Sequence, residues 1–253
     1  MLRHKATQLY SGTLDRKVAQ LLRGKALAQD FHLYVIDVAC RHTLDIPDKF
    51  FDSACDVGNT WNRGLDLAAI DKDRIAVDSQ RFGFGSVAYA GGGRAVVKGR
   101  SHTCTQLPDY QAHIMSGESE IAKLQRNPSY IVQRVLNGGG RELNVFLLRD
   151  LRTRQLHFLC YYAVFDPTRN VNRKLTACRF EAVPEQQVEG VLAKLRAYAD
   201  ALALDYARVE LIHDTAAQEW FLIDINNSPG GGPLTNIAAP KVAQLLERLC
   251  APR

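Results

Sequence analysis

The sequence has no long apolar run and no apolar N-terminal segment. No run approaches the roughly 20 residues that span a bilayer, and the opening residues MLRHKATQLY lack the apolar core of a signal peptide. The six cysteines form no CxxC pair and several lie in apolar segments, which indicates reduced thiols. These absences predict a cytoplasmic protein without a membrane span.

Motifs for nucleic acid and zinc are also missing. No recognition helix, zinc finger or aromatic-basic motif accompanies the formal net charge of +5, which is spread along the chain. That charge favours anionic ligands only weakly, so we expect no nucleic-acid partner. His102, Cys104 and His113 lack the spacing of zinc ligands. Phosphate-bearing ligands remain compatible with this composition.

What is present is typical of a globular protein. The chain has 253 residues, of which 46% are hydrophobic and 23% charged, and it contains no internal repeat or low-complexity tract. This length is enough for one large domain, or for two small ones that share a cleft.

The periodicity of apolar residues predicts both helices and strands. Helical spacing marks the residues before about 30, 184–204 and 240–249, and strand patterns mark 31–39, 94–97, 129–150 and 157–165. Within 129–150 we expect two strands joined as a hairpin by the glycines at 138–140. No Gly-Lys-Ser/Thr follows those glycines, so they do not form a Walker loop.

The stretch 207–233, ARVELIHDTAAQEWFLIDINNSPGGGP, carries the strongest chemical signal. It reads as two strands joined by a polar turn, with Glu210 and Asp224 inside apolar runs, where a carboxylate is costly to bury without a partner. Asn226 is two residues beyond Asp224 and points to the same face, and a hairpin would bring Glu210 alongside. Three oxygen ligands before a glycine-rich loop suit Mg2+ held against nucleotide phosphates. A strand end followed by an ordinary turn is the alternative.

This pattern resembles the C-terminal metal-binding hairpin of the ATP-grasp superfamily. The resemblance implies that Glu210, Asp224 and Asn226 hold Mg2+ between the phosphates of ATP. The family more often has Glu where this chain has Asp224, a change that keeps the ligand chemistry but shortens its reach.

The same resemblance extends upstream to a nucleotide site. Lys98 follows an apolar pair and matches the lysine that contacts the α- and β-phosphates, although a lysine at a strand end also extends readily into solvent. Lys72 falls where a second nucleotide-contacting lysine occurs in relatives, but a solvated turn is the favoured interpretation for it. Gln133, Arg134 and Val135 match the linker whose backbone hydrogen-bonds the adenine edge. The polar segment 100–127 is expected to form a flexible loop over the phosphates, which would exclude water.

Basic residues complete the expected site. The run Arg141 to Val145 resembles a strand that is commonly acidic-x-Arg-Val in the family, but Asn144 replaces the arginine, and the sequence leaves open whether Arg141 substitutes for it. In relatives a basic residue near 168–179 neutralises the γ-phosphate during transfer. Arg173 and Lys174 are the candidates here, and a solvated charged edge is the alternative.

The resemblance therefore implies an α+β, ATP-grasp fold with two sheet-bearing lobes that clasp ATP. Residues 1–75 would form a shortened N-terminal α/β region and residues 76–253 the nucleotide-binding and catalytic region. The implied activity is an ATP- and Mg2+-dependent carboxylate-amine ligase, acting on a small-molecule, peptide or saccharide carboxylate and an amine, and a homodimer is possible. A small-molecule kinase on the same fold and a nucleotide-binding regulatory module without turnover are the alternatives.

Overall fold

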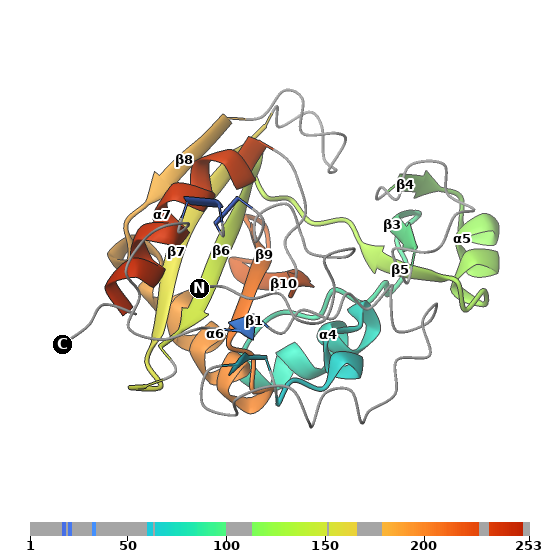
Figure 1. The fold of residues 1–253 in the computed structure, drawn as a ribbon. Coiled ribbons are helices and arrows are strands. Elements are labelled where there is room, and N and C mark those ends of the chain that lie inside the picture. The colour runs from blue at the N-terminus through green and yellow to red at the C-terminus, as the bar shows by residue number, and fades with distance from the viewer. Residues whose placement is uncertain are drawn as a thin grey trace.

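The computed structural model describes residues 17–18, 20–21, 32–33, 60–62, 64–99, 113–150, 152–165, 179–227 and 233–249. Within them lie a large antiparallel sheet, a small antiparallel sheet, and helices packed on both (Figure 1). The expected α+β class is confirmed. No helix in these ranges is long and apolar enough to cross a membrane.

The large sheet forms the centre of the protein. Its strands are β6 (Arg141–Arg149), β7 (Leu156–Val164), β8 (Arg179–Val183), β9 (Tyr206–Asp214) and β10 (Glu219–Asn226). They pair antiparallel in the order β10-β9-β6-β7-β8. β9 and β10 are the two strands expected from the stretch 207–233, and β7 is the strand expected at 157–165.

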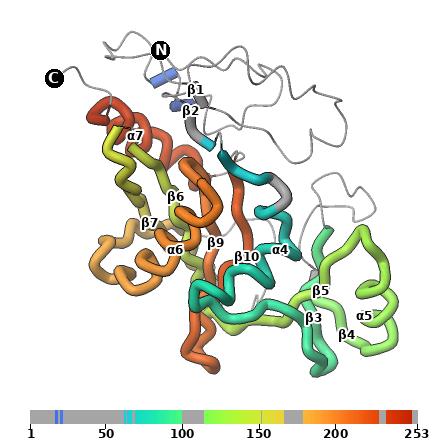
Figure 2. The backbone as a smooth tube through the Cα atoms, turned by 90° about the horizontal axis from the view of Figure 1, so that it is seen from below, coloured from blue at the N-terminus to red at the C-terminus, as the bar shows by residue number. Residues whose placement is uncertain are grey.

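Each face of this sheet packs against a helix (Figure 2). On one face, Leu143, Val145 and Leu211 pack with α6 (Glu189–Ala201), which is preceded by the 3-10 helix η4 (Glu185–Val188). On the other face, Phe146 and Leu148 pack with α7 (Pro233–Leu249). Each fully buried Leu or Phe side chain contributes about 1.5–3 kcal/mol, so these two layers hold the sheet in place.

The small sheet forms a lobe beside the large one (Figure 1). It consists of β3 (Arg94–Gly99), β4 (His113–Ser116) and β5 (Tyr130–Arg134) in the order β4-β3-β5, with α5 (Glu118–Gln125) against it. The chain passes from β5 to β6 through the glycines at 138–140. The expected hairpin there is wrong, because β5 pairs with β3 whereas β6 pairs with β7 and β9. The glycine segment joins two lobes instead of two paired strands.

The C-terminal helix begins earlier than expected. α7 starts at Pro233, and Pro240 lies inside it. A proline in a helix interior loses one backbone hydrogen bond. Here Ala238, Ala239, Val242 and Leu246 are buried on both sides of Pro240, and this burial offsets the loss.

The N-terminal segments contact the large sheet. β1 (His32–Leu33) pairs in parallel with β2 (Thr60–Trp61). After them come η2 (Leu67–Ile70), α4 (Lys72–Asp78) and η3 (Ser79–Phe82), and Ile70 and Ile75 are buried in the same apolar cluster as α6. The expected boundary between residues 75 and 76 stays a prediction.

Asn62 ties this N-terminal part to the start of β9. Its Oδ1 accepts hydrogen bonds from the backbone N–H of Asp205 (2.8 Å) and Tyr206 (2.9 Å), and its Nδ2 donates to the carbonyl of Tyr206 (2.7 Å). Its own backbone N–H donates to Asp205 Oδ2 at 3.1 Å. The Asn62 side chain thus hydrogen-bonds the backbone of Asp205 and Tyr206 as an adjacent β-strand would.

Candidate active site

A row of polar side chains crosses three neighbouring strands of the large sheet. Asn144 on β6 is the register partner of Glu210 on β9, and Glu210 is the register partner of Asp224 on β10. The β9–β10 register shifts between Leu222 and Asp224, so Ile223 is an extra residue. Register partners of an antiparallel pair point to the same face, and a bulge changes which residue faces the partner. The bulge therefore places Asp224 on the face that carries Glu210.

Asn226 joins this row. Its Nδ2 lies 3.3 Å from Glu210 Oε1 and 3.4 Å from Asp224 Oδ2. The Asn226 amide is therefore within hydrogen-bonding distance of both carboxylates, and all three side chains proposed from the sequence as metal ligands lie on one face of the sheet.

Glu142 adds a further carboxylate that the sequence reasoning did not select. It lies on β6 two residues before Asn144, on the same face, and Asn144 Nδ2 donates to Glu142 Oε1 at 3.0 Å. Burial, with the nearby Glu210 carboxylate, raises the pKa of Glu142 to about 8. The period-2 pattern in RELNV contains this signal, because Glu142 alternates with apolar residues as Asn144 does.

Arg208 is the second residue that was missed. It lies on β9 two residues before Glu210 and donates from Nη2 to Glu210 Oε1. Burial opposes its charge, but Glu210, Glu142 and Asp224 together raise its pKa. Its Nε–H is buried and has no hydrogen-bond partner in the part of the chain that the structure describes. The cluster thus contains a permanent cation with a donor to spare.

Lys98 reaches toward this cluster from the small sheet. Burial lowers the pKa of its ammonium, as does the nearby Lys72, whereas the carboxylates of Asp224, Glu210 and Glu142 raise it. Lys72 lies on α4, and its Nζ is 3.5 Å from the carbonyl oxygen of Gly99, the residue that follows Lys98. Lys72, for which the sequence favours a solvated turn, therefore lies on a helix beside Lys98, and Lys98 is close enough to the carboxylates to interact with them electrostatically.

The expected linker residues lie at the end of β5 and just beyond it. Gln133 is 5% exposed, and its Nε2 has no hydrogen-bond partner among the described residues. The guanidinium of Arg134 lies 5.1 Å from the ring centroid of Phe221 on β10. Val135 follows β5 directly and is partly buried. The segment thus crosses between the lobes on the face that carries the polar row.

The structure does not bring Arg141 to this cluster. Arg141 alternates with Glu142 along β6, so it points to the opposite face of the sheet, where its guanidinium lies 5.6 Å from the ring centroid of Tyr162. Arg173 and Lys174, like His102 and Cys104, lie outside the described residues. Their expected roles stay predictions.

The fold is similar to known ligases, although the sequence is not. No protein-family model matches the chain, and a search of curated proteins found no match. Among solved structures, the D-alanine–D-alanine ligase from Bacillus anthracis aligns with a TM-score of 0.54 at 16% identity, over 91% of this chain and 82% of that one. The ATP-grasp ligase PsnB, complexed with a minimal precursor, aligns with a TM-score of 0.50 at 14% identity, over 75% of this chain and 63% of PsnB. The chain has the ATP-grasp fold.

A third ligase agrees with this assignment. The L-amino acid ligase from Bacillus licheniformis aligns with a TM-score of 0.50 at 13% identity, over 73% of this chain and 48% of that one. The chain thus spans about half of that ligase and less than two thirds of PsnB.

The donor set of this cluster fits Mg2+. Glu210 and Asp224 carry carboxylate oxygens and Asn226 carries an amide oxygen, which are the ligand types that hard divalent cations prefer. No three His, Cys, Asp or Glu side chains form a metal cluster within the described ranges, so the site depends on the Asn226 amide as well as the carboxylates. Burial is the main cause of the raised pKa of Glu142, and the neighbouring Glu210 carboxylate adds to it; a divalent cation would offset that second contribution.

Proposed function

We propose that this chain is an ATP- and Mg2+-dependent ligase that activates a carboxylate as an acylphosphate and joins it to an amine. The observation that carries the proposal is the polar row Asn144, Glu210 and Asp224 on one sheet, with Lys98 beside it from the other. The likeness in fold to an L-amino acid ligase and a D-alanine–D-alanine ligase supports an amino acid or peptide as the carboxylate.

In this proposal the two lobes divide the binding of ATP. Lys98, assisted by Lys72, neutralises the α- and β-phosphates, because a lysine at a cleft can donate to several phosphate oxygens. The backbone at 133–135 binds the adenine edge, and the unpartnered Nε2 of Gln133 is a further donor for the nucleotide. Glu210, Asp224 and Asn226 hold Mg2+, which when bound neutralises phosphate charge and orients the γ-phosphate.

The proposed chemistry has two steps. A carboxylate oxygen of the acceptor attacks the γ-phosphorus of ATP, the bond to the β,γ-bridging oxygen breaks, and ADP leaves. The amine nitrogen then attacks the acylphosphate carbon, loses a proton to solvent and expels inorganic phosphate, giving an amide. The protein contributes mainly positioning and charge neutralisation. Arg208, with its spare buried donor, is the described cation best placed for the transferring phosphate or the acceptor carboxylate. Arg173 and Lys174 remain proposed for the same role.

The first test is a thermal-shift assay with ATP, ADP and GTP, each with and without Mg2+. A ligand that binds only the folded state stabilises it by about 3 kcal/mol at about 100 times its Kd. We expect a Mg2+-dependent increase in Tm with ATP. Absence of a shift with any nucleotide, in protein shown to be folded, would count against the ATP site.

The second test measures ADP release with amino-acid and peptide carboxylates in the presence of amines. A ligase releases ADP only when both the carboxylate and the amine are present. We expect mass spectrometry to find a product in which the two are condensed. ADP release with a phosphorylated hydroxyl product would identify a kinase instead. Mg2+-dependent ATP binding without turnover would favour the alternative that the chain is a nucleotide-binding regulatory module.

A further inference from the structure

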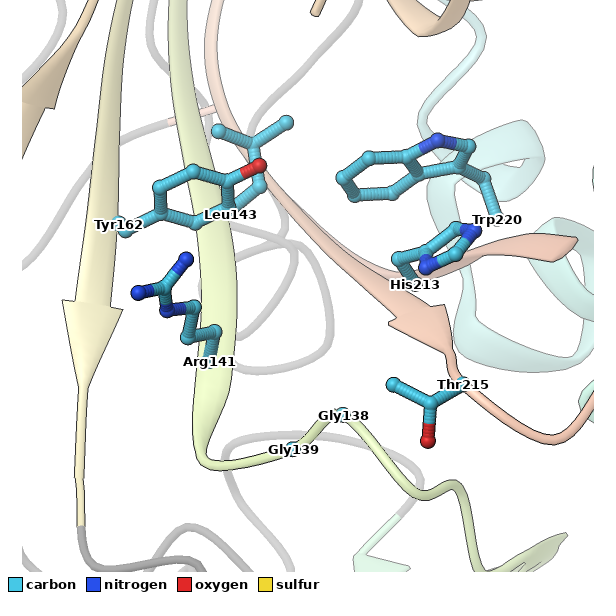
Figure 3. A pocket seen from close by; sticks show the side chains of 8 residues that line it. All are labelled: Gly138, Gly139, Arg141, Leu143, Tyr162, His213, Thr215 and Trp220. Carbon is cyan, nitrogen blue, oxygen red and sulfur yellow. The ribbon is translucent and has the colours of Figure 1, made fainter. Parts of the chain in front are cut away.

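A pocket lies on the face of the large sheet opposite the polar row (Figure 3). Its volume is about 480 Å3, and it is lined by Gly138, Gly139, Arg141, Leu143, Tyr162, His213, Thr215 and Trp220. Pockets that bind small molecules typically have volumes of roughly 300–1,000 Å3. Apart from the catalytic candidate Arg141, no residue expected at the active site from the sequence lines it.

The register of the strands places this pocket away from the cleft. Leu143 is the partner of both Tyr162 and Leu211, and these side chains share the face that packs on α6. Arg141 and Leu143 alternate along β6 with Glu142 and Asn144. A ligand in the pocket is therefore separated from the polar row by the sheet itself, and it cannot contact both.

The chemistry of the pocket is aromatic and positive. Arg141 lies 5.6 Å from the Tyr162 ring centroid, and the His213 and Trp220 rings are 5.1 Å apart with a tilt of 55°. Figure 3 shows the Tyr162 and Trp220 rings on opposite sides of the cavity, with Arg141 beside one and His213 beside the other. Among the described residues no Asp or Glu lines the cavity, and no hydrogen-bond acceptor in those residues is paired with the Arg141 guanidinium.

The floor of the pocket is held by hydrogen bonds between two loops. The backbone N–H of Thr215 donates to the carbonyl of Asn137 at 2.9 Å, and the N–H of Asn137 donates to Asp214 Oδ2 at 3.1 Å. A Cβ on Gly138 would lie 2.7 Å from the carbonyl oxygen of Arg141, so the close approach of the chain there requires glycine. The pocket is thus preformed and does not depend on a ligand to organise it.

We propose that this pocket binds a planar aromatic carboxylate. The two aromatic side chains offer faces for stacking, and the Arg141 fork pairs with a carboxylate through two parallel hydrogen bonds. The lining contains no carboxylate to pair with an ammonium group, which disfavours a free amino acid. The site is separate from the nucleotide cleft and does not rest on the proposed ligase activity.

The test is isothermal titration calorimetry of the full chain with indole-3-acetate and phenylacetate, without nucleotide. Indole-3-acetamide, which is neutral, is the matched ligand control. We expect saturable binding of the acids, with the amide at least about tenfold weaker because it cannot form a charge-assisted pair. Arg141→Gln should weaken binding of the acids by a similar factor, and Trp220→Leu should also weaken it.

The matched protein control is Arg152→Gln, because Arg152 is exposed at the turn beyond the far end of β6. It should bind the acids as the unsubstituted chain does. Lack of saturable binding at millimolar concentration overturns the proposal, as does equal binding by Arg141→Gln, verified as folded by circular dichroism. Displacement of the acids by ATP with Mg2+ would place them in the cleft and would also overturn it.

Discussion

Glu210 lies directly opposite Asp224 because one extra residue, Ile223, interrupts the pairing of β9 with β10. In an uninterrupted ladder Ile223 would occupy the position opposite Glu210, and Asp224 would point to the apolar face that packs on α6. The bulge therefore turns Asp224 toward Glu210 and toward Lys98, the residue proposed to bind phosphate. Bulges often occur beside active sites for this reason.

Replacing Asp224 with alanine should remove Mg2+-dependent turnover while the protein stays folded. The variant loses one of the two carboxylates that lie within 3.4 Å of the Asn226 amide nitrogen, and we expect a decrease in ADP-release rate of at least about a hundredfold. Circular dichroism and ADP release are measured together. Glu189→Ala, an exposed carboxylate on α6, is the control and should retain activity. Full activity in Asp224→Ala would remove the metal assignment.

Replacing Lys98 with methionine should weaken ATP binding by about tenfold or more, because an ammonium that donates to phosphate oxygens contributes about 1.5–3 kcal/mol. Calorimetry with ATP and Mg2+ measures the affinity. Lys123→Met, at an exposed position of α5 in the same lobe, is the matched control. Equal affinities of the two variants would remove Lys98 from the proposed nucleotide site.

Replacing Arg149 with methionine should destabilise the fold without touching the cleft. The Arg149 side chain is buried and donates to Asp205 Oδ1 (2.7 Å), Asp200 Oδ1 (2.7 Å) and the carbonyl of Arg154 (2.9 Å). Without it, the buried Asp205 loses its closest cation, and the free energy of unfolding should fall by about 3–5 kcal/mol. Urea denaturation measures this. In Arg152→Met the change should stay within about 0.5 kcal/mol, and a similar value for Arg149→Met would show that the buried network contributes little.

The stability contributed by Asp214 should depend on pH. Partial burial opposes its charge, but backbone N–H groups of Ala217, Asn137 and Ala216 lower its pKa below the usual value. A lowered folded-state pKa gives stability that is fully present above the unfolded pKa of about 3.9 and is lost as the pH falls through the folded value.

Asp214→Asn should therefore be less stable than the unsubstituted chain by about 2 kcal/mol at neutral pH. The difference in free energy of unfolding should shrink below about pH 4, where the aspartate becomes protonated. Parallel urea denaturation of both proteins from neutral to acidic pH measures it. A difference that is independent of pH would assign the effect to packing instead of charge.

Much of the candidate site could be predicted because its signal is local. Asp224 and Asn226 are two residues apart in a strand, and an acidic residue inside an apolar run is visible in the sequence alone. Lys98 was visible for a similar reason, as a cation at the end of the apolar strand Arg94–Gly99.

What could not be predicted depends on pairing between distant strands. The glycines at 138–140 favour a turn, but only the pairing of β5 with β3 reveals that they join two lobes. Glu142 and Arg208 could not be assigned to the site without the β6–β9 register, which sets Asn144 opposite Glu210. The same alternation carries Arg141 to the other face, which sequence proximity to Glu142 does not reveal.

The hydrogen bonds of Asn62 limit where the chain can be divided into fragments. It supplies the backbone partners at Asp205 and Tyr206, and Ile70 and Ile75 are buried in the cluster under β6 and β9. A gene fragment beginning at residue 76 would encode the proposed catalytic strands, but it would leave those backbone groups unpaired and part of the core open to water. For recombinant expression, fusion or domain swapping, residues 60–75 should therefore be kept together with the residues that follow them.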